Sequence, residues 1–495
     1  MERKTIETVT PESVGIPSGK IKDLIAHLED HSLPMHSFLI LRHGKLASES
    51  YWAPFHRERK HRMYSISKSF VSLAVGIMAD EGKLSLDDTV ASHFPEYVPE
   101  NAHEYITRAT IRDMLRMTDC HEGSTYWFGD DNWVKTWFDK PPSHPAGAIF
   151  SYNTICTNLC CAIVEKIAGM PFIDYLYPRL LSPIGATSGI KCIASPEGCY
   201  SFGGSGVLCT PLDLARVAQL CLNGGAWDGK QLVSEAYIKE ATGKQVDNTL
   251  TSSGTYDKQG YGYQIWRTCE NGFAFYGMGS QYAIGLPDYD MVIAMTADTQ
   301  GSTVAAHVIF DAIFAKLLPS VTAGNEALPE NPRDFDELAK LSASLALRAI
   351  PGSPSSPTAK RVSGVKYRFA ENLLNISSAQ FDFNGDEVRM TYEKPNGSHV
   401  LTFGIGKLVR QAFPETHYSG LRIGVPAGYG YETHACAAWA DDNTLLAKAS
   451  VTDDYFGSFQ MNATFIGDEL TLLMTKIAED FLHDYQGFAA GKACV

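Results

Sequence analysis

A Pro- and Ser-rich stretch, PGSPSSPTAK at residues 351–360, separates two parts of the chain that differ in hydrophobic period. Apolar residues before it recur mainly at helical spacing, whereas those after it alternate with polar residues in short runs between turn signals. A stretch of this composition has no apolar face to bury, as is typical of a linker. We therefore predict a first domain over residues 1–332, a helix and linker over 333–360, and a second domain over 361–495.

The first domain is expected to combine a sheet with helices. Strand-like segments lie near its start, at residues 37–52, and after Gly254, so the sheet should take its edges from both ends of the domain. Helical spacing predicts helices at residues 67–82, Ile111–Met117, Thr157–Ala168, Leu212–Leu222 and Val304–Leu317. Short, evenly spaced strands in the second domain indicate a small antiparallel barrel or sandwich. The predicted fold class is α+β followed by an all-β domain.

The balance of charge argues against a nucleic-acid partner. The chain has 42 Lys and Arg against 56 Asp and Glu, a formal net charge of −14, whereas binding to duplex phosphates needs clustered cations. No apolar core of a secretory signal follows the charged start of the chain. The first long apolar stretch, Phe70 to Ala79, is shorter than the roughly 20 residues of a membrane span. We therefore expect a cytoplasmic protein with no membrane partner.

Three patterns that can mark other chemistry favour plain structural interpretations. The 11 cysteines lack paired C-x-x-C spacing with histidine partners, so we expect reduced thiols and no metal site. His121 and Glu122 are adjacent, so their side chains diverge, and a loop surface is favoured over a metal pair. The GGSG sequence at residues 203–206 predicts a turn, because Val207 stands where a lipase-type nucleophile elbow needs glycine.

The segment RMYSISKSF, residues 62–70, carries the main chemical signal. Ser65 and Lys68 are three residues apart at the start of a predicted helix, so they share a face and the lysine amine can reach the serine hydroxyl. A serine hydroxyl needs a neighbouring base to become a nucleophile, and a lysine serves when burial or a nearby cation lowers its pKa. The S-x-x-K pattern alone fits an N-capping serine beside a solvated lysine equally well, so context decides.

Two further segments supply that context. Tyr152 precedes a predicted helix in AIFSYNTICTNLCCAIVEKIAG, and GMGSQYAIGLP at residues 277–287 is a Gly-rich strand onset that lets the backbone approach a ligand closely. In this order the three segments resemble the serine β-lactamase and penicillin-binding-protein superfamily, in its class C β-lactamase-like and esterase branch. The resemblance spans residues 12–318 and includes EGKLSLDDTVASHFPE, TIRDMLRMT and FGGSGVLCTPLDLARVAQLCLNGG. The second domain is similar to the accessory β-domain of some of these hydrolases.

The resemblance implies a β-lactamase-like fold, with an antiparallel sheet flanked by helices plus a helical subdomain, and a role for each motif. Ser65 would attack a carbonyl and carry the acyl group, and Lys68 would share or accept its proton. Tyr152 would shuttle protons to the leaving group and later to water, helped by an adjacent Lys ammonium that lowers its pKa from about 10. The backbone N–H groups of Ser65 and Ser280 would form the oxyanion hole.

Two departures from the family pattern bear on the substrate. Thr154 stands where the Y-x-N motif of Tyr152 has asparagine, and GMG at residues 277–279 replaces the Lys-Thr-Gly or His-x-Gly of penicillin-recognising members. The second change removes a side chain that helps hold a β-lactam carboxylate, which favours an ester or amide, with Gln281 offering an amide beside the acyl site. Trp127, in the aromatic loop TYWFGDDNW, fits a core position and a cleft wall equally well. The expected substrate-binding residues are Ser280, Gly279, Gln281, Thr154 and Trp127.

We therefore predict a serine hydrolase without a cofactor that cleaves a small ester or amide, β-lactams and D-amino-acid derivatives among them, through an acyl-enzyme on Ser65. Two alternatives use the same fold. One is a non-hydrolytic acyl-binding or scaffold protein, favoured by Thr154 and the missing third-motif cation; the other is an acyltransferase with the same residues. The substrate, the role of the second domain and the formation of homo-oligomers stay open.

Overall fold

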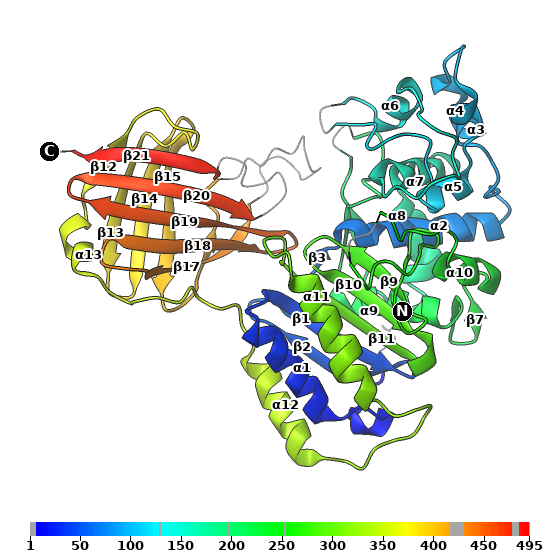
Figure 1. The fold of residues 1–495 in the computed structure, drawn as a ribbon, viewed down its shortest axis with the longest axis horizontal. Helices are drawn as coiled ribbons and strands as arrows, with labels where there is room; N and C mark the ends of the chain where they lie inside the picture. Colours follow the sequence, from blue (N-terminus) through cyan, green and yellow to red (C-terminus); the bar gives the residue numbers. More distant parts are fainter. Residues whose placement is uncertain are drawn as a thin grey trace. The chain divides into compact units, whose positions relative to one another are not determined.

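The computed structural model of the chain describes residues 6–127, 130–195, 198–251, 254–415, 430–477 and 485–494. The chain divides into two compact units, Met1–Leu345 and Ala346–Val495 (Figure 1). The first unit combines helices with a six-stranded antiparallel sheet, and the second consists mainly of antiparallel strands. These architectures confirm the expected α+β fold followed by an all-β domain.

The main sheet of the first unit joins strands from both of its ends. Its strand order is β2-β1-β11-β10-β9-β8. The strands are β1 (Met35–Arg42), β2 (Lys45–Tyr51), β8 (Trp266–Arg267), β9 (Phe273–Gly277), β10 (Gln281–Leu286) and β11 (Met291–Ala297). Phe38 of β1 lies opposite Met295 of β11, so the first and last strands of the unit meet inside the sheet. The two edges, β2 and β8, therefore come from opposite ends of the unit, as predicted.

Helices cover both faces of this sheet. On one face, α1 (Ser18–Asp30) packs against α12 (Pro332–Ser344), which also contacts β2, and α11 (Ala305–Asp311) lies beside them (Figure 1). On the other face, α9 (Pro211–Leu222) packs on β1, β10 and β11. The helix expected at the start of the connecting segment is α12, and it packs on α1 within the first unit.

Two long helices of the first unit carry the chemical motifs. They are α2 (Ser67–Asp80) and α7 (Thr154–Ala168), and they pack against each other through apolar faces. α7 begins three residues before the expected Thr157 because Asn153 caps it, its side-chain oxygen accepting a hydrogen bond from the Ile155 N–H. Both helices therefore begin beside a motif residue, Ser65 or Tyr152.

Shorter elements complete the first unit. The helices are α3 (Val90–His93), α4 (Glu104–Arg108), α5 (Ile111–Leu115), α6 (Trp133–Asp139), α8 (Phe172–Leu176) and α10 (Glu235–Thr242). The strands are β3 (His61–Arg62), β4 (Lys191–Cys192), β5 (Val207–Cys209), β6 (Ala226–Trp227) and β7 (Lys230–Gln231). β3, β5 and β4 form a small sheet next to the Ser65 turn, and β6 pairs with β7.

The second unit is a barrel preceded by the short helix α13 (Pro357–Val362). Its strands are β12 (Lys366–Phe369), β13 (Ser378–Asn384), β14 (Glu387–Lys394), β15 (Gly397–Ile405), β16 (Val409–Ala412), β17 (Glu432–Trp439), β18 (Thr444–Thr452), β19 (Phe456–Ile466), β20 (Glu469–Ile477) and β21 (Gly487–Ala493). They pair in the order β15-β14-β13-β12-β21-β20-β19-β18-β17-β16, and β15 also pairs with β17. This last pairing closes the sheet into the expected barrel.

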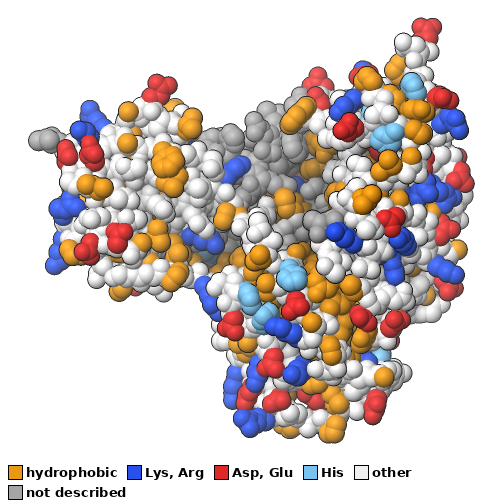
Figure 2. Space-filling view, in the orientation of Figure 1, with side chains coloured by type: hydrophobic (Ala, Val, Ile, Leu, Met, Phe, Trp, Pro, Cys, Tyr) orange, Lys and Arg blue, Asp and Glu red, His pale blue; other side chains and the backbone are white. Residues whose placement is uncertain are grey.

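The surface agrees with the charge balance of the sequence. Acidic and basic side chains are interspersed over the face seen in Figure 2, and the described residues of that face gather no large basic area. None of the helices in the described part of the chain has the length and apolarity that a bilayer crossing requires.

Candidate active site

Ser65 lies in a strained turn directly before helix α2. The turn is a single 3₁₀ segment, Tyr64–Ile66, and Tyr64 has a φ of 47°, a left-handed conformation that non-glycine residues rarely adopt. Ser67 fixes this turn from the helix side, because its hydroxyl donates to the Tyr64 carbonyl at 2.6 Å and accepts from the Val207 N–H at 2.9 Å. The arrangement presents Ser65 at the N-terminal end of α2, where the helix dipole favours negative charge.

The predicted contact between Ser65 and Lys68 is present. The Nζ of Lys68 lies 2.9 Å from the Oγ of Ser65 and donates a hydrogen bond to the Gly204 carbonyl at 2.7 Å. Lys68 is buried, with 2% of its surface exposed. A neutral amine in this position can keep its bond to Gly204 and still accept the proton of Ser65.

The carbonyl that holds Lys68 comes from the GGSG turn. A Cβ at Gly204 would overlap Cγ2 of Thr154, the first residue of α7, so only glycine lets the turn approach this helix so closely. The Gly204 N–H also donates to Oδ1 of Asn158 at 3.0 Å. The sequence predicted the turn but did not indicate that it belongs to the site. The two adjacent glycines were the signal that this turn packs closely on another element.

Tyr152 reaches the same point from the start of α7. Its phenol lies close enough to the Ser65 hydroxyl to affect its own pKa, and Nζ of Lys68 lies 5.1 Å from the centroid of its ring. Desolvation raises the pKa of Tyr152 to about 12, and the interaction with Ser65 opposes this only in part. The pKa therefore moves opposite to the expected direction, because the loss of water around the phenol outweighs the effect of Ser65. At neutral pH the phenol is a proton donor.

Aromatic side chains hold the ring of Tyr152 on its outer side. Its centroid lies 5.3 Å from that of Trp266 and 6.4 Å from that of Tyr261, while 40% of the residue surface stays exposed. Trp266 also stacks on Tyr276 of β9, at 5.5 Å between centroids. Residues 260–268, GYGYQIWRT, belong to the region after Gly254 that was predicted to form strands, and their aromatic content was the missed signal for this contact.

The GMG segment lies against the Ser65 turn. A Cβ at Gly277 would overlap the carbonyl oxygen of Met63, so this glycine serves the approach of two backbones to each other. Gly279 and Ser280 follow with φ values of 79° and 67°, and this left-handed pair turns the chain into β10. The Ser280 hydroxyl hydrogen-bonds with that of Thr299 at 2.6 Å. The turn places Ser280 directly before the first residue of β10.

Gln281 lies inside the protein and not at the open site, where it was expected. The residue is fully buried, and its Nε2 donates to the carbonyls of Ala297, Met278 and Gly279 at 2.6, 3.0 and 3.1 Å. Its Oε1 accepts from the Ala297 N–H at 3.3 Å. The amide therefore fastens the GMG segment to β11 and leaves no donor for a substrate.

Trp127 lies at the surface and not in the core. It is 81% exposed, and its carbonyl accepts a hydrogen bond from Nε1 of the buried Trp133 at 3.1 Å. The neighbouring Phe128 lies outside the described residues. Thr154, by contrast, touches the Gly204 turn. The structure thus brings Ser65, Lys68, Tyr152 and Thr154 together, with the GMG segment beside them.

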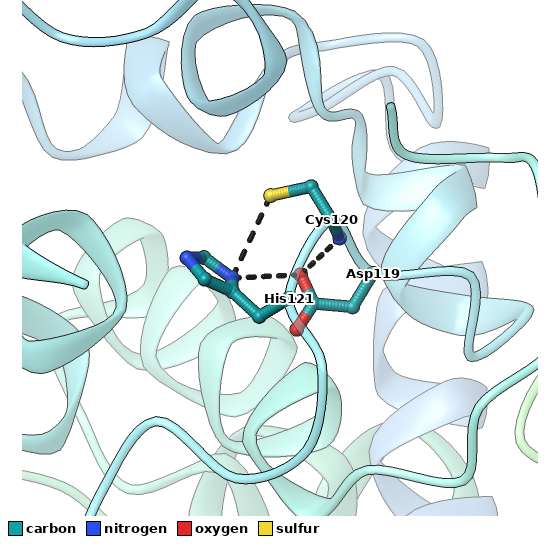
Figure 3. Close-up of side chains that lie close together, drawn as sticks. All are labelled: Asp119, Cys120 and His121. Atoms are coloured by element: carbon teal, nitrogen blue, oxygen red, sulfur yellow. Dashed lines mark hydrogen bonds and ion pairs between the residues drawn. The ribbon is translucent and has the colours of Figure 1, made fainter. Parts of the chain in front are cut away.

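Three consecutive side chains have the donor types of a metal site: Asp119, Cys120 and His121 (Figure 3). Nδ1 of His121 lies 3.4 Å from Oδ1 of Asp119 and 3.5 Å from the sulfur of Cys120. Nε2 of His121 faces the carbonyl of Lys140 at 2.8 Å and donates to it. His121 is buried and Glu122 is exposed, so the expected loop surface was wrong for His121 only. Among the described residues, these three each offer a ligand atom, and the three atoms lie within 4.8 Å of one another.

Residues 21–317 match the family model described as Beta-lactamase. The chain belongs to the beta-lactamase family. This match confirms the resemblance stated from the sequence and the expected enzyme class, a serine hydrolase.

Named relatives of the chain are hydrolases. It is 25% identical over 272 residues to the 6-aminohexanoate-dimer hydrolase of Paenarthrobacter ureafaciens. The alignment covers 50% of this chain and 68% of that protein. It is 24% identical over 189 residues to esterase EstB of Burkholderia gladioli. This alignment covers 32% of this chain and 47% of the esterase. The chain therefore spans about half the length of the esterase that it matches.

Solved structures share the fold. A candidate 6-aminohexanoate-dimer hydrolase from Bacillus anthracis has a TM-score of 0.52 at 20% identity, covering 63% of this chain and 86% of that one. A crystal structure of SurE has a TM-score of 0.50 at 16% identity, covering 96% of this chain and 98% of that one. At these identities the likeness concerns the fold alone, and for SurE it extends over both units.

Proposed function

We propose that the chain is a hydrolase of small esters or amides that works through an acyl-enzyme on Ser65. The observation that carries the proposal is the distance of 2.9 Å between Nζ of Lys68 and the Ser65 hydroxyl, with the phenol of Tyr152 beside this pair. A base and a proton donor next to one hydroxyl are what acyl transfer to serine requires. Membership of the beta-lactamase family and the hydrolase and esterase relatives support it.

The acylation step follows from the protonation states. Oγ of Ser65 adds to the substrate carbonyl while its proton passes to the Lys68 amine, and the carbonyl oxygen becomes an oxyanion. The neutral Tyr152 phenol gives its proton to the leaving oxygen or nitrogen, whose bond to the carbonyl carbon then breaks. The Lys68 ammonium returns the proton to Tyr152. The acyl group stays on Ser65, and the alcohol or amine departs.

Deacylation runs through the same groups. A water molecule adds to the acyl carbonyl and loses a proton to the pair of Lys68 and Tyr152, which returns one to Oγ of Ser65 as the ester bond breaks. In both steps the backbone N–H groups of Ser65 and Ser280 are the proposed donors to the oxyanion. The contact of Gly277 with Met63 supports this pairing, because it brings the GMG segment beside the Ser65 turn.

The rim of the site supports an uncharged acyl group. Tyr152 and Met278 expose 40% and 41% of their surfaces, and both belong to segments in contact with the Ser65 turn. The GMG segment has no lysine or histidine side chain, and the Gln281 amide is used inside the protein. We therefore propose esters and amides with apolar acyl groups ahead of β-lactams, whose carboxylate needs a donor at this place.

The decisive experiment is the removal of one hydroxyl. Ser65→Ala should abolish hydrolysis of a p-nitrophenyl ester and labelling by a fluorophosphonate, followed by intact mass, while the melting temperature stays within a few degrees of wild type. Ser13→Ala is the matched control, because this serine is exposed on the surface. Unchanged turnover in Ser65→Ala would falsify the proposal.

A further inference from the structure

A buried carboxylate lies beneath the loop that carries Tyr152. Asp119 is fully buried, and its Oδ1 accepts hydrogen bonds from the Cys120 N–H at 2.6 Å and from Nε1 of Trp137 at 2.9 Å. Its Oδ2 accepts a hydrogen bond from Nδ2 of Asn153 at 3.3 Å. Figure 3 shows the carboxylate turned toward both Cys120 and His121. Asp119 thus links the α6 segment to the residue that follows Tyr152.

Asn153 has a fixed amide orientation because of this carboxylate. Its Nδ2 faces two groups that only accept hydrogen bonds, Oδ2 of Asp119 and the Gly123 carbonyl at 2.9 Å. The oxygen of the amide is therefore left for the Ile155 N–H, at 3.3 Å, and this bond caps α7. Loss of the carboxylate would remove one of the two acceptors that hold the amide in the capping orientation.

The main chain on both sides of Tyr152 contacts the segment that leads to Asp119. The Ser151 N–H donates to the Met117 carbonyl at 2.8 Å, and the Asn153 N–H faces the Met117 sulfur at 3.4 Å. Met117 itself has a φ of 57°, which turns the chain toward Asp119. Residues 151 and 153 are thus fastened to residues 117–123, and Tyr152 stands between them.

We infer that Asp119 is a positioning residue for Tyr152. Through the Asn153 amide it sets where the Tyr152 phenol meets the Ser65 hydroxyl. This inference rests on the proposed function, because it assigns Asp119 a part in the proton transfer to the leaving group. A displacement of about 1 Å between reacting groups costs on the order of 10²-fold in rate, so a buried group far from the substrate can control turnover.

The hydrogen bonds of this cluster explain its three side chains better than metal ligation does. Oδ1 of Asp119 already accepts from two donors, and His121 is bound to the Lys140 carbonyl through Nε2. Burial and the charge of Asp119 raise the pKa of the Cys120 thiol, whereas a metal binds the thiolate. Asp119 therefore acts through its hydrogen bonds as a buried support for the Tyr152 loop.

Asp119→Asn tests the inference, because it puts an amide N–H against the donors of Asn153 or Trp137. We expect kcat for an alkyl ester to fall about 10- to 100-fold with KM within about twofold of wild type. A p-nitrophenyl ester should lose less, since its leaving group departs without a proton. Asn153→Ser keeps a capping hydroxyl but lacks the bond to Asp119, so it should show the same kcat loss even if Asp119→Asn folds poorly.

Two comparisons separate positioning from general damage. Cys120→Ala changes the same buried cluster without touching Asn153, so its kcat should stay within about twofold of wild type at a comparable loss of melting temperature. In a Tyr152→Phe background, Asp119→Asn should change kcat by less than about twofold, because both act through one proton transfer.

Equal losses from Asp119→Asn with and without Tyr152, or an equal loss in Cys120→Ala, would overturn the inference. So would a folded Asp119→Asn protein with the kcat of wild type. These outcomes differ from a failure of the proposed function, in which wild type itself neither hydrolyses the esters nor is labelled at Ser65.

Discussion

Gly277 at the end of β9 lies directly against the backbone of Met63, two residues before Ser65. A Cβ at this position would overlap the Met63 carbonyl oxygen. The atom in the way belongs to the backbone, so a flexible side chain cannot relieve the overlap. The glycine is therefore what lets the GMG segment and the Ser65 turn meet.

We expect Gly277→Ala to lower kcat/KM for an ester by about tenfold or more, since it must push Ser65 away from the proposed oxyanion donor at Ser280. Its melting temperature should fall as well. Ester hydrolysis and thermal unfolding measure the two effects. Gly189→Ala is the control, because the nearest atoms to its Cβ would lie at 3.8 Å, an ordinary contact. Equal activities of the two variants would contradict this account.

Lys68→Ala should slow acylation by roughly 10²- to 10⁴-fold, because the amine that touches the Ser65 hydroxyl is lost. Lys68→Arg should be similarly slow, since a guanidinium keeps its proton and cannot act as a base. The rate of fluorophosphonate labelling, followed by intact mass, reports the acylation step alone. Lys20→Ala, at an exposed lysine, is the control. Labelling of both Lys68 variants within about fivefold of wild type would exclude Lys68 as the base.

The part of the site that the sequence predicts is the part encoded locally. Ser65 and Lys68 touch because three residues along a helix face the same way, and that spacing is visible in the sequence. The Gly204 carbonyl that also holds Lys68 is 136 residues away in the chain, and no local pattern specifies the pairing. The fold class was predictable for a similar reason, because hydrophobic period and strand spacing are local properties.

Burial explains the expectations that failed. His121 and Glu122 are adjacent, so the sequence favoured a loop surface over a metal pair, yet packing against Trp137 covers His121. Gln281 carries an amide that suits a ligand, but the buried carbonyls around it take every donor. The pKa of Tyr152 moved opposite to the expected direction because desolvation depends on neighbours from distant segments.

Gln281→Met should destabilise the first unit by about 2–4 kcal/mol, because it removes a buried amide that donates to the carbonyls of Ala297, Met278 and Gly279. Activity should fall together with stability, since the GMG segment then loses its anchor to β11. Urea unfolding gives the free energy, and ester hydrolysis gives the activity. Gln300→Met removes a partly exposed amide that donates to Asp298 at 3.0 Å, and it should change stability by less than about 0.5 kcal/mol. A Gln281 variant as stable as this control would contradict the anchoring role.

Tyr152 should remain a neutral phenol over the whole range in which an ordinary tyrosine ionises. Its pKa is raised to about 12, so the folded protein holds this proton more tightly than the unfolded chain, whose tyrosine titrates near 10. The stabilisation from this difference is complete below pH 10 and is lost as pH rises from 10 toward 12.

A phenolate absorbance titration of wild type minus Tyr152→Phe should therefore show no ionisation near pH 10. Wild type should lose stability relative to Tyr152→Phe only above that pH. A Tyr152 midpoint at or below 10 would mean that the phenol can be the resting base, and the proton order proposed for acylation would then reverse.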